Sequence, residues 1–451
     1  MNALRKLARS SLVRLNPSSR AILASGARIT ILAVAAKLFT VLREVTLAYR
    51  FGTSATVDSF NIAFTVTTWL PILLVSSAAT GLVPLLVASV RDRSAHRVVL
   101  AELNAAILVL AFLLSSIAAA AAPWASAAMT GAILPEMFTL TRLMIVQLAP
   151  VAGLGLIAGY LATRLQAQQR YLYTLGEALP PFGLALAAIL PAELPDGMAL
   201  TIGLLAGTIV QILFLVALLS RSSEGLGGVS LRFTSPYWPR IRGAIGTLAV
   251  GAGILWIAVP VEQAYAARLG AGAVASLNYA SRLLGLGTTI AIVIIARALL
   301  PSFSRAVADG EIVLGRRLAY HWTMICGALG IVCVVAAWPL TPIAVRLLLQ
   351  RGAFGGDDAA IVTELVHIGL LQLPFFFAGT TLVQWCASNG QFRAISIIAA
   401  LTVTVKIALL QLLVPRYGIN ALMISTVGMY AAALTSHVFW LYKGMRSVEV
   451  L

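Results

Sequence analysis

Charged residues are scarce in this chain. They make up 11% of its 451 residues, whereas roughly 25% is usual for a soluble domain. Hydrophobic residues reach 60%, and the mean hydropathy is +0.94. This composition excludes an ordinary soluble enzyme or binding domain, and it predicts a protein that lies largely within a membrane.

Residues that carry catalytic chemistry are also few. The three cysteines all fall in apolar stretches, so no disulfide framework is expected: Cys326, Cys333 and Cys386. Of the four histidines, only His367 forms an E-x-x-H step, with Glu364, and a di-iron bundle needs two such steps plus further carboxylates. No GxxxxGK[ST] loop, Ser/His/Asp set or metal cluster stands out. We therefore expect no enzyme, no cofactor and no metal site.

Long apolar runs, by contrast, are abundant. Most reach the roughly 20 residues that a helix needs to cross the hydrocarbon layer. They predict an all-α polytopic membrane protein with about 12 transmembrane helices. The expected spans are 29–49, 58–88, 98–122, 138–162, 172–190, 198–220, 244–267, 276–303, 320–348, 360–386, 394–415 and 419–442.

The basic residues predict the orientation. With the N-terminus in the cytoplasm, 21 of the 32 Lys and Arg residues fall in cytoplasmic segments and 5 in outer loops, while the other 6 lie inside or at the ends of spans. This asymmetry is typical of the positive-inside rule. It places both termini in the cytoplasm and attributes the net charge of +16 to topology and anionic lipid, not to nucleic acid.

One polar interruption divides the chain into halves. The stretch "SRSSEGLGGVSLRFTSPYWPRIRG", 220–243, separates six spans from six spans, an arrangement common in transporters. The first residues lack an apolar core with a cleavage site, so we expect no cleaved signal peptide. The predicted parts are a basic cytoplasmic N-terminal segment (1–28), an N-terminal six-helix lobe (29–220), a cytoplasmic linker (221–243), a C-terminal six-helix lobe (244–443) and a cytoplasmic tail (444–451).

Several charges lie where lipid is expected, at a cost of at least about 2.5–3.5 kcal/mol each at the bilayer centre. They are Lys37, Arg43, Glu44, Asp58, Glu262, Arg282, Arg297 and Lys406. Lys37 and Glu44 are a heptad apart, so the first span presents a broad polar face that we expect to line a hydrated cavity. One interpretation is a set of internal ion pairs. The excess of cations favours a cavity that binds an anion, and Arg suits phosphate.

Four stretches carry a specific pattern of charged and small residues. They are "KLFTVLREVTLAYRFGTSATVDSFNIAF" (37–64) with "GLVPLL" (81–86), "VEQAYAARLGAGAVASLNYASRLLGL" (261–286) with "ALLPSFSRAVADG", "LLLQRGAFGGDDA" (347–359) and "LVPRYGINALMIST" (413–426). In order and spacing they resemble the MurJ/MviN family of lipid-linked oligosaccharide flippases. The resemblance implies the fold of the multidrug/oligosaccharidyl-lipid/polysaccharide exporter superfamily, with two six-helix lobes around a central cavity. It also implies the flipping of a polyprenyl-diphosphate-linked sugar, which is lipid II in the best-known members.

The resemblance also assigns site residues. Basic residues of the first and eighth helices are thought to meet the diphosphate in that family, which implies a binding role here for Lys37, Arg43 and Arg282. Glu44 and Asp58 stand at the family's acidic positions, and Arg351 falls in its outer "RGAF" loop.

The chain also departs from the family pattern. Members that flip lipid II usually have fourteen helices, whereas about twelve are expected here, and "WLPILLVSSAATG" (69–81) lacks the charges of the family's second span. Some members bind sodium near the eleventh helix, where this chain has Lys406. We hypothesise that the Lys406 ammonium replaces that cation and pairs with Glu262, so that membrane potential or protons drive transport. A purely structural pair is the alternative.

The sequence therefore predicts a multi-pass flippase of the bacterial cytoplasmic membrane, working by alternating access on lipid II or a related cell-envelope glycan precursor. An exopolysaccharide or O-antigen unit is the alternative substrate. Weaker alternatives are a cation-coupled drug exporter, a membrane glycan polymerase or ligase, and a non-transporting scaffold. We expect a monomer, with envelope-synthesis enzymes as candidate partners.

Overall fold

The structure is a computed structural model that describes residues 36–90, 92–131, 135–189 and 197–446, and these residues form helices and turns with no strand. The basic segment 1–28, the start of the first expected span and the last five residues of the expected tail lie outside the described residues. The first described helix covers residues 36–51. The later helices are α3 (Ala55–Ser89), α4 (Arg93–Thr130), α5 (Pro135–Ala167), α6 (Tyr173–Gly176), α7 (Leu179–Ile189), α8 (Met198–Ser220), α9 (Trp238–Trp256), α10 (Ala258–Ala267), α11 (Ala273–Ala308), α12 (Ile312–Leu348), α13 (Gly356–Leu370), α14 (Leu373–Ser388), α15 (Phe392–Tyr417) and α16 (Asn420–Arg446).

Each expected span coincides with a helix or with two consecutive helices. Among the described residues, seven helices are long and apolar enough to cross a membrane, and counting the bent pair α13–α14 as one span gives eight. The polytopic all-α class is confirmed, while the total of about twelve spans stays a prediction. The bend between α13 and α14 is 43°, and Pro374 stands at the start of α14. Proline is tolerated at this position because its missing N–H would have no helical partner there.

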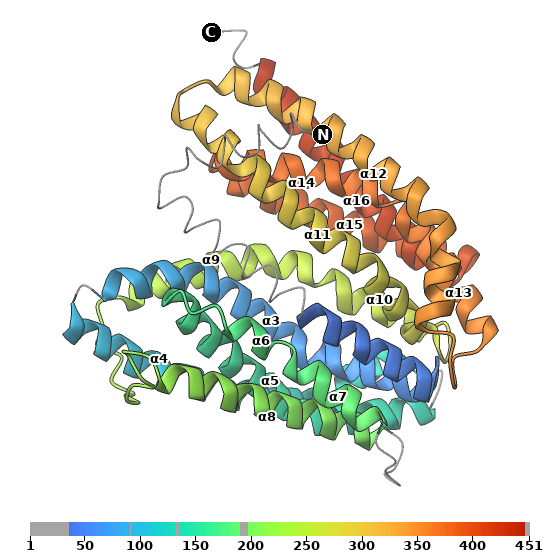
Figure 1. The fold of residues 1–451 in the computed structure, drawn as a ribbon, viewed down its shortest axis with the longest axis horizontal. Helices are drawn as coiled ribbons and strands as arrows, with labels where there is room; N and C mark the ends of the chain where they lie inside the picture. The colour runs from blue at the N-terminus through green and yellow to red at the C-terminus, as the bar shows by residue number, and fades with distance from the viewer. Residues whose placement is uncertain (1–35, 91, 132–134, 190–196, 447–451) are drawn as a thin grey trace, which may run out of the picture.

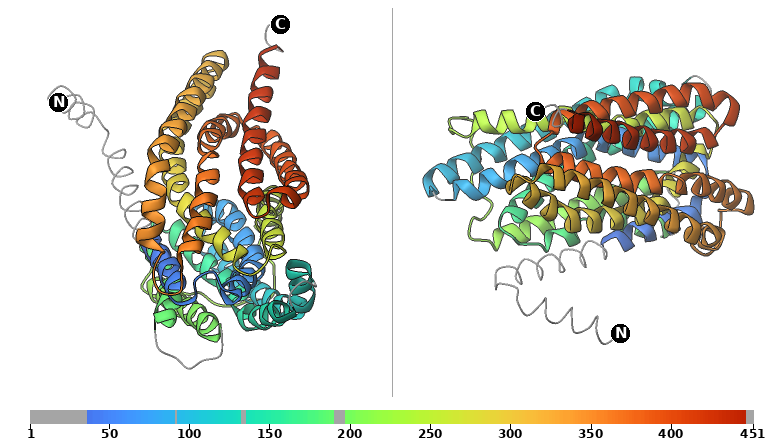
Figure 2. Two further views of the ribbon diagram at one scale, coloured as in Figure 1. Left: turned by 90° about the vertical axis from the view of Figure 1, so that its right-hand side faces the viewer. Right: turned by 90° about the horizontal axis from the view of Figure 1, so that it is seen from above.

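The helices gather in two groups (Figure 1). Helices α3, α4, α5 and α8 pack on one another, and α11 to α16 form the second group. Helices α9 and α10 lie between the groups and contact helices of both. Seen from above in Figure 2, most long helices run close to one common direction, as membrane-spanning helices do.

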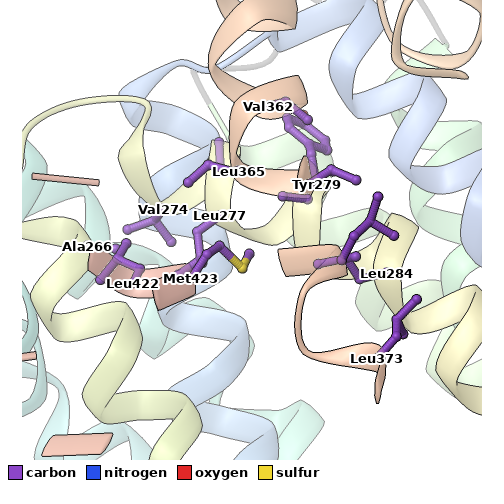
Figure 3. Packing of buried hydrophobic residues seen from close by; sticks show 14 of the residues in the cluster. Ala266, Val274, Leu277, Tyr279, Leu284, Val362, Leu365, Leu373, Leu422 and Met423 are labelled. Atoms are coloured by element: carbon purple, nitrogen blue, oxygen red, sulfur yellow. The ribbon is translucent and has the colours of Figure 1, made fainter. Parts of the chain in front are cut away.

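The second group is held by a continuous apolar core (Figure 3). Leu277 of α11, Leu365 of α13 and Met423 of α16 are at most 3% exposed and belong to the same buried cluster. In lipid, such contacts stabilise helix pairs mainly through close van der Waals packing, because the tails are as apolar as the side chains.

Small residues set the spacing of α7 and α8. A Cβ atom added at Gly183 would lie 2.6 Å from the Gly203 carbonyl oxygen, and one at Gly207 would lie 2.6 Å from the Leu179 carbonyl oxygen. The Gly203–Gly207 spacing therefore permits close backbone approach, as such spacings do in membranes. Of the similar pair in α5, Gly159 meets Val75 while Gly155 faces open space.

The polar linker is fastened to the first group. Arg164 of α5 is 1% exposed and donates to the carbonyl oxygens of Leu226 (2.8 Å) and Gly225 (2.9 Å). Asn104 of α4 donates to Leu226 and Gly228, and the Ser230 N–H donates to Ala101. A Ser/Gly-rich stretch is thus held against α4 and α5 along its length.

A buried carboxylate holds the end of the same linker. Glu102 of α4 is fully buried and accepts hydrogen bonds from the Thr234 and Ser235 backbone N–H groups and from the Trp238 indole. Because α9 begins at Trp238, inside the range expected to be linker, Glu102 fixes the start of this helix.

We expect Gly207→Ala to lower the free energy of unfolding by about 1–3 kcal/mol, because its Cβ would push against the backbone of α7. Gly155→Ala is the matched control, since it meets open space in a helix interior and should be neutral or slightly stabilising. Thermal unfolding of both variants in detergent checks this; equal midpoints would contradict the packing argument.

Candidate functional site

One carboxylate joins the two groups of helices at the polar face of the first described helix. The Glu44 Oε1 atom bonds the Arg43 guanidinium of the same helix and lies 3.5 Å from the Arg282 Nε atom of α11. The Arg43 and Glu44 side chains are 9% and 10% exposed, whereas Arg282 is 46% exposed. The adjacent opposite charges at 43 and 44 therefore have a physical reason. The Glu44 carboxylate neutralises the buried Arg43 guanidinium and also reaches Arg282 on α11.

A cavity of about 140 Å³ opens beside this cluster. Lys37 and Glu44 line it from one helix, and Tyr279, Ser281 and Arg282 line it from α11. The heptad spacing thus places Lys37 and Glu44 on one face, as the sequence predicted. Lys37, Arg43 and Arg282 bring three positive charges to this neighbourhood, where Glu44 lies between the two arginines and Glu177 acts electrostatically on Lys37.

Asp58 lies outside this cavity. It is fully buried at the start of α3, where its two carboxylate oxygens accept from the backbone N–H groups of Gly272 and Ala275, each at 2.6 Å. It therefore acts as the N-terminal cap of α11 from another helix, and the helix dipole stabilises its negative charge. The sequence grouped Asp58 with the substrate-binding residues, but the structure places it in a contact between the two groups.

Further contacts surround Asp58 and close this end of the molecule. The Ala353 N–H donates to the Tyr49 carbonyl (2.8 Å), and the Thr53 hydroxyl donates to Asp358 (2.5 Å). The Tyr279 hydroxyl donates to the Gly52 carbonyl at 3.1 Å. We call these contacts among residues 49–58, 270–279 and 351–358 the outer closure, because the distribution of basic residues predicts that this end faces outward. It joins the first described helix and α3 to the second group.

Two glycines allow the outer closure to form. A Cβ at Gly52 would lie 2.5 Å from the Ala353 oxygen, and one at Gly352 would lie 2.2 Å from the Tyr49 oxygen. Both have positive φ, +57° and +61°. Arg351 is exposed in the same loop and does not line the cavity with Lys37 and Arg282. The backbone of the "RGAF" stretch, more than its charge, makes the contact.

A second buried ion pair lies in the other group. The Lys406 Nζ atom of α15 is 2.8 Å from the Glu262 Oε2 atom of α10, and Lys406 is 3% exposed. The pairing that the sequence suggested is therefore formed. Thr426 of α16, which the sequence did not single out, accepts from Lys406 and donates to Glu262, each at 3.0 Å. Three helices meet in this closed ring of charge-assisted hydrogen bonds.

The Glu364–His367 step has other partners. Glu364 accepts from Asn420 at 2.6 Å, while His367 stacks on Trp338 with ring centroids 4.3 Å apart. The described residues contain no group of three or more His, Cys, Asp and Glu side chains placed to hold a metal ion. The step is therefore an interhelical contact.

Comparisons with known proteins agree on one family. Residues 47–449 match the family model described as "Lipid II flippase MurJ". A "Probable lipid II flippase MurJ" from Rhizobium tropici is 28% identical over 167 residues, which is 37% of this chain and 31% of the relative. The chain matches the curated relatives over 31–44% of their own length.

Solved structures show a similar fold. The chain resembles the structure titled "Lipid II flippase MurJ, inward closed conformation" with a TM-score of 0.78 and 16% identity, covering 92% of this chain and 87% of that one. It also resembles an inward-facing MATE family transporter of the MOP superfamily, with a TM-score of 0.75 and 14% identity over 93% of this chain and 98% of that one. These likenesses establish the membrane-transporter fold.

We expect Asp58→Ala to open the outer closure. The substitution leaves two backbone donors of α11 without an acceptor, at a cost of about 1–3 kcal/mol, which corresponds to roughly a 5- to 150-fold shift toward an open outer end. Spin labels at the exposed positions Glu136 and Arg351, one in each group, would report the change as a longer distance. Asp309→Ala, at an exposed position outside the outer closure, is the control and should leave the distances unchanged.

We expect Lys406→Met alone to destabilise the protein by about 3–5 kcal/mol, because it leaves the Glu262 carboxylate without its counter-charge. The double variant Lys406→Met, Glu262→Gln should recover most of this loss, because no unpaired charge then remains. Unfolding of both single variants and the double variant in detergent completes a double-mutant cycle. Additive losses would show that the two residues do not interact.

Proposed function

The chain belongs to the lipid II flippase MurJ family, and we propose that it moves a polyprenyl-diphosphate-linked glycan across the bacterial cytoplasmic membrane. The observation that carries this proposal is the Arg43–Glu44–Arg282 cluster beside the cavity that Lys37 lines. A diphosphate is a compact polyanion, and guanidinium groups bind phosphate oxygens through paired charge-assisted hydrogen bonds. An isoprenoid tail needs no pocket, because it can remain in the surrounding lipid.

The Glu44 carboxylate would compete with a diphosphate for the same two arginines. This carboxylate bonds Arg43 and lies near Arg282, and this contact lowers the cost of burying the cations. A diphosphate that enters at Arg282, the most exposed of the three residues, would take over part of this neutralisation. Binding would then replace the Glu44–Arg282 contact between the first described helix and α11. The substrate would in this way alter the interface between the two groups of helices.

The outer closure supports a cycle of alternating access. We assign residues 29–220 and 244–443 to two lobes and both termini to the cytoplasm, on the basis of the charge asymmetry of the sequence. With the outer closure formed, the cavity would receive the head group from the cytoplasmic side. Breaking the contacts of Asp58, Thr53 and Tyr49 would then release it on the other side. No covalent bond is made or broken, so the proposed activity is transport and not catalysis.

The Lys406–Glu262 pair suits a coupling role. Each member loses its counter-charge if the other changes protonation, and the pair connects α10, which lies between the groups, to α15 and α16. An ammonium fixed in the chain supplies the positive charge that a bound cation would otherwise bring. We propose that protons or membrane potential drive the cycle through this pair.

The diphosphate site would accept more than one lipid-linked glycan. Lipid II is the substrate named for the relatives, and a capsule or exopolysaccharide unit carried on the same diphosphate would meet the same cationic groups. The cavity residues recognise the shared diphosphate, which leaves the choice of sugar to contacts outside the cluster.

We expect Arg282→Ala to weaken the binding of a prenyl diphosphate by about 10- to 150-fold, because it removes one or two charge-assisted hydrogen bonds of roughly 1.5–3 kcal/mol. Titration of purified protein in detergent with a short-chain prenyl diphosphate would measure the affinity. Arg317→Ala removes an exposed arginine of α12 and is the matched control. Equal affinity of the parent and Arg282→Ala would overturn the proposed site.

Growth tests the transport itself. The protein is expressed in a bacterial host whose lipid II flippase has been depleted, with membrane insertion confirmed. Rescue by the parent and not by Arg43→Ala, Arg282→Ala would establish lipid II as a substrate. An inserted protein that binds prenyl diphosphate and gives no rescue would exclude lipid II and leave other polyprenyl-linked glycans as substrates.

A further inference from the structure

A second, larger cavity lies within the helices of the second group and has no part in the diphosphate site. Its volume is about 340 Å³, and helices α9, α11, α14, α15 and α16 line it. Leu255 of α9 and Ile292 of α11 are exposed at its border. The lining is mostly apolar, yet the side chains of Thr380, Gln384, Tyr430 and His437 also reach it.

His437 lines this cavity and keeps a buried ring nitrogen that can accept a proton. The residue is 5% exposed, and its Nδ1 atom lies 2.7 Å from the Ala433 carbonyl oxygen. Because a carbonyl can only accept, Nδ1 must carry the hydrogen, and the neutral ring then has its lone pair on Nε2. The Nε2 atom is buried, and none of the described residues offers it a hydrogen-bond partner. A buried nitrogen in this state can take up a proton when water reaches it.

The cavity extends from this histidine toward the buried ion pair. His437 lies one turn before Trp440, whose indole donates to Gln391 in the turn between α14 and α15, the end that we assign to the cytoplasm. At the other end, Thr402 and Tyr430 lie one helical turn from Lys406 and Thr426, respectively. The cavity therefore runs from near one membrane surface to within a turn of the Lys406–Glu262 ring.

We propose that this cavity is a proton route from the cytoplasm to Glu262, with His437 as the relay residue. The inference rests on the coupling role proposed above for the Lys406–Glu262 pair. The His437 Nε2 atom takes a proton from cytoplasmic water and passes it through water in the cavity to the Glu262 carboxylate. One O–H bond of a hydronium ion breaks, the N–H bond on Nε2 forms and then breaks, one O–H bond forms on Glu262, and nothing is oxidised or reduced.

The proton changes the contact between helices. A protonated Glu262 no longer offsets the Lys406 ammonium, so the attraction that holds α10 against α15 is lost. Among the described residues, the titratable groups that line the cavity are Tyr430 and His437, and those in the ring are Glu262 and Lys406. His437 is the one among them whose ordinary pKa lies near neutral pH.

The first experiment measures both the rate at which the outer closure responds to a drop in pH and the end point of that response. A fluorophore and a quencher on cysteines at positions 136 and 351, with the three native cysteines replaced, report the outer closure after a rapid drop in pH. In His437→Gln the amide can still donate to the Ala433 carbonyl but cannot carry a proton. We expect the parent to respond and His437→Gln to reach the same end point at least about tenfold more slowly. His321→Gln, an exposed histidine of α12, is the control.

Two outcomes would overturn the relay. Equal rates for the parent and His437→Gln would exclude His437 from the route. No response of the parent to pH would exclude proton coupling and the relay together. Failure of growth rescue with a normal pH response would count against the proposed substrate alone, so the two proposals fail in different measurements.

A second measurement tests whether water fills the cavity. Cysteine at position 433 faces the cavity, whereas cysteine at the exposed position 435 lies on the outside of α16. A charged methanethiosulfonate reagent reacts with a thiolate in water, so we expect it to label Ala433→Cys and to leave Thr435→Cys, in lipid, unlabelled. A folded Ala433→Cys that stays unlabelled would show a dry cavity and overturn the route.

Discussion

The free-energy cost of a charge inside a membrane is the constraint on which this structure depends. Each acidic side chain discussed here satisfies it by reaching a different helix: Glu44 lies near Arg282, Asp58 caps α11, and Glu262 pairs with Lys406. A carboxylate that must find its partner elsewhere also fixes the position of that partner. The charges that are costly to insert are therefore the ones that define how the helices are arranged.

The same constraint makes these contacts replaceable. A buried pair contributes little net stability relative to apolar packing, but removal of one member is costly. Exchange of one anionic partner for another would keep a buried cation neutralised throughout. The buried apolar cluster that contains Leu277 of α11 also includes Val57 and Ile62 of α3, so apolar packing joins the two groups beside the charged contacts.

The sequence predicted the helices and the membrane class well, because long apolar runs and the distribution of arginine are strong one-dimensional signals. Helical spacing also predicted the shared face of Lys37 and Glu44, and the resemblance to the family suggested the Lys406–Glu262 pair. The sequence did not indicate that Asp58 caps α11. A buried carboxylate at a helix start has the same local pattern whether its partner is a ligand or a backbone 214 residues away. Thr426 gave no signal for the same reason, because an isolated threonine in a span usually bonds its own helix.

The stretch at 221–243 has the composition of a flexible linker, yet it is bound to neighbouring helices. As a free chain it could extend to roughly 75–80 Å, and its contour length would place almost no limit on how far two lobes could separate. It is bound to α4 and α5 instead, through Arg164, Asn104 and Glu102. The part of the connection that is not bound to the first group therefore begins only with α9. Each lobe then stays at a high effective concentration relative to the other, and re-formation of the outer closure requires a small rotation rather than a search.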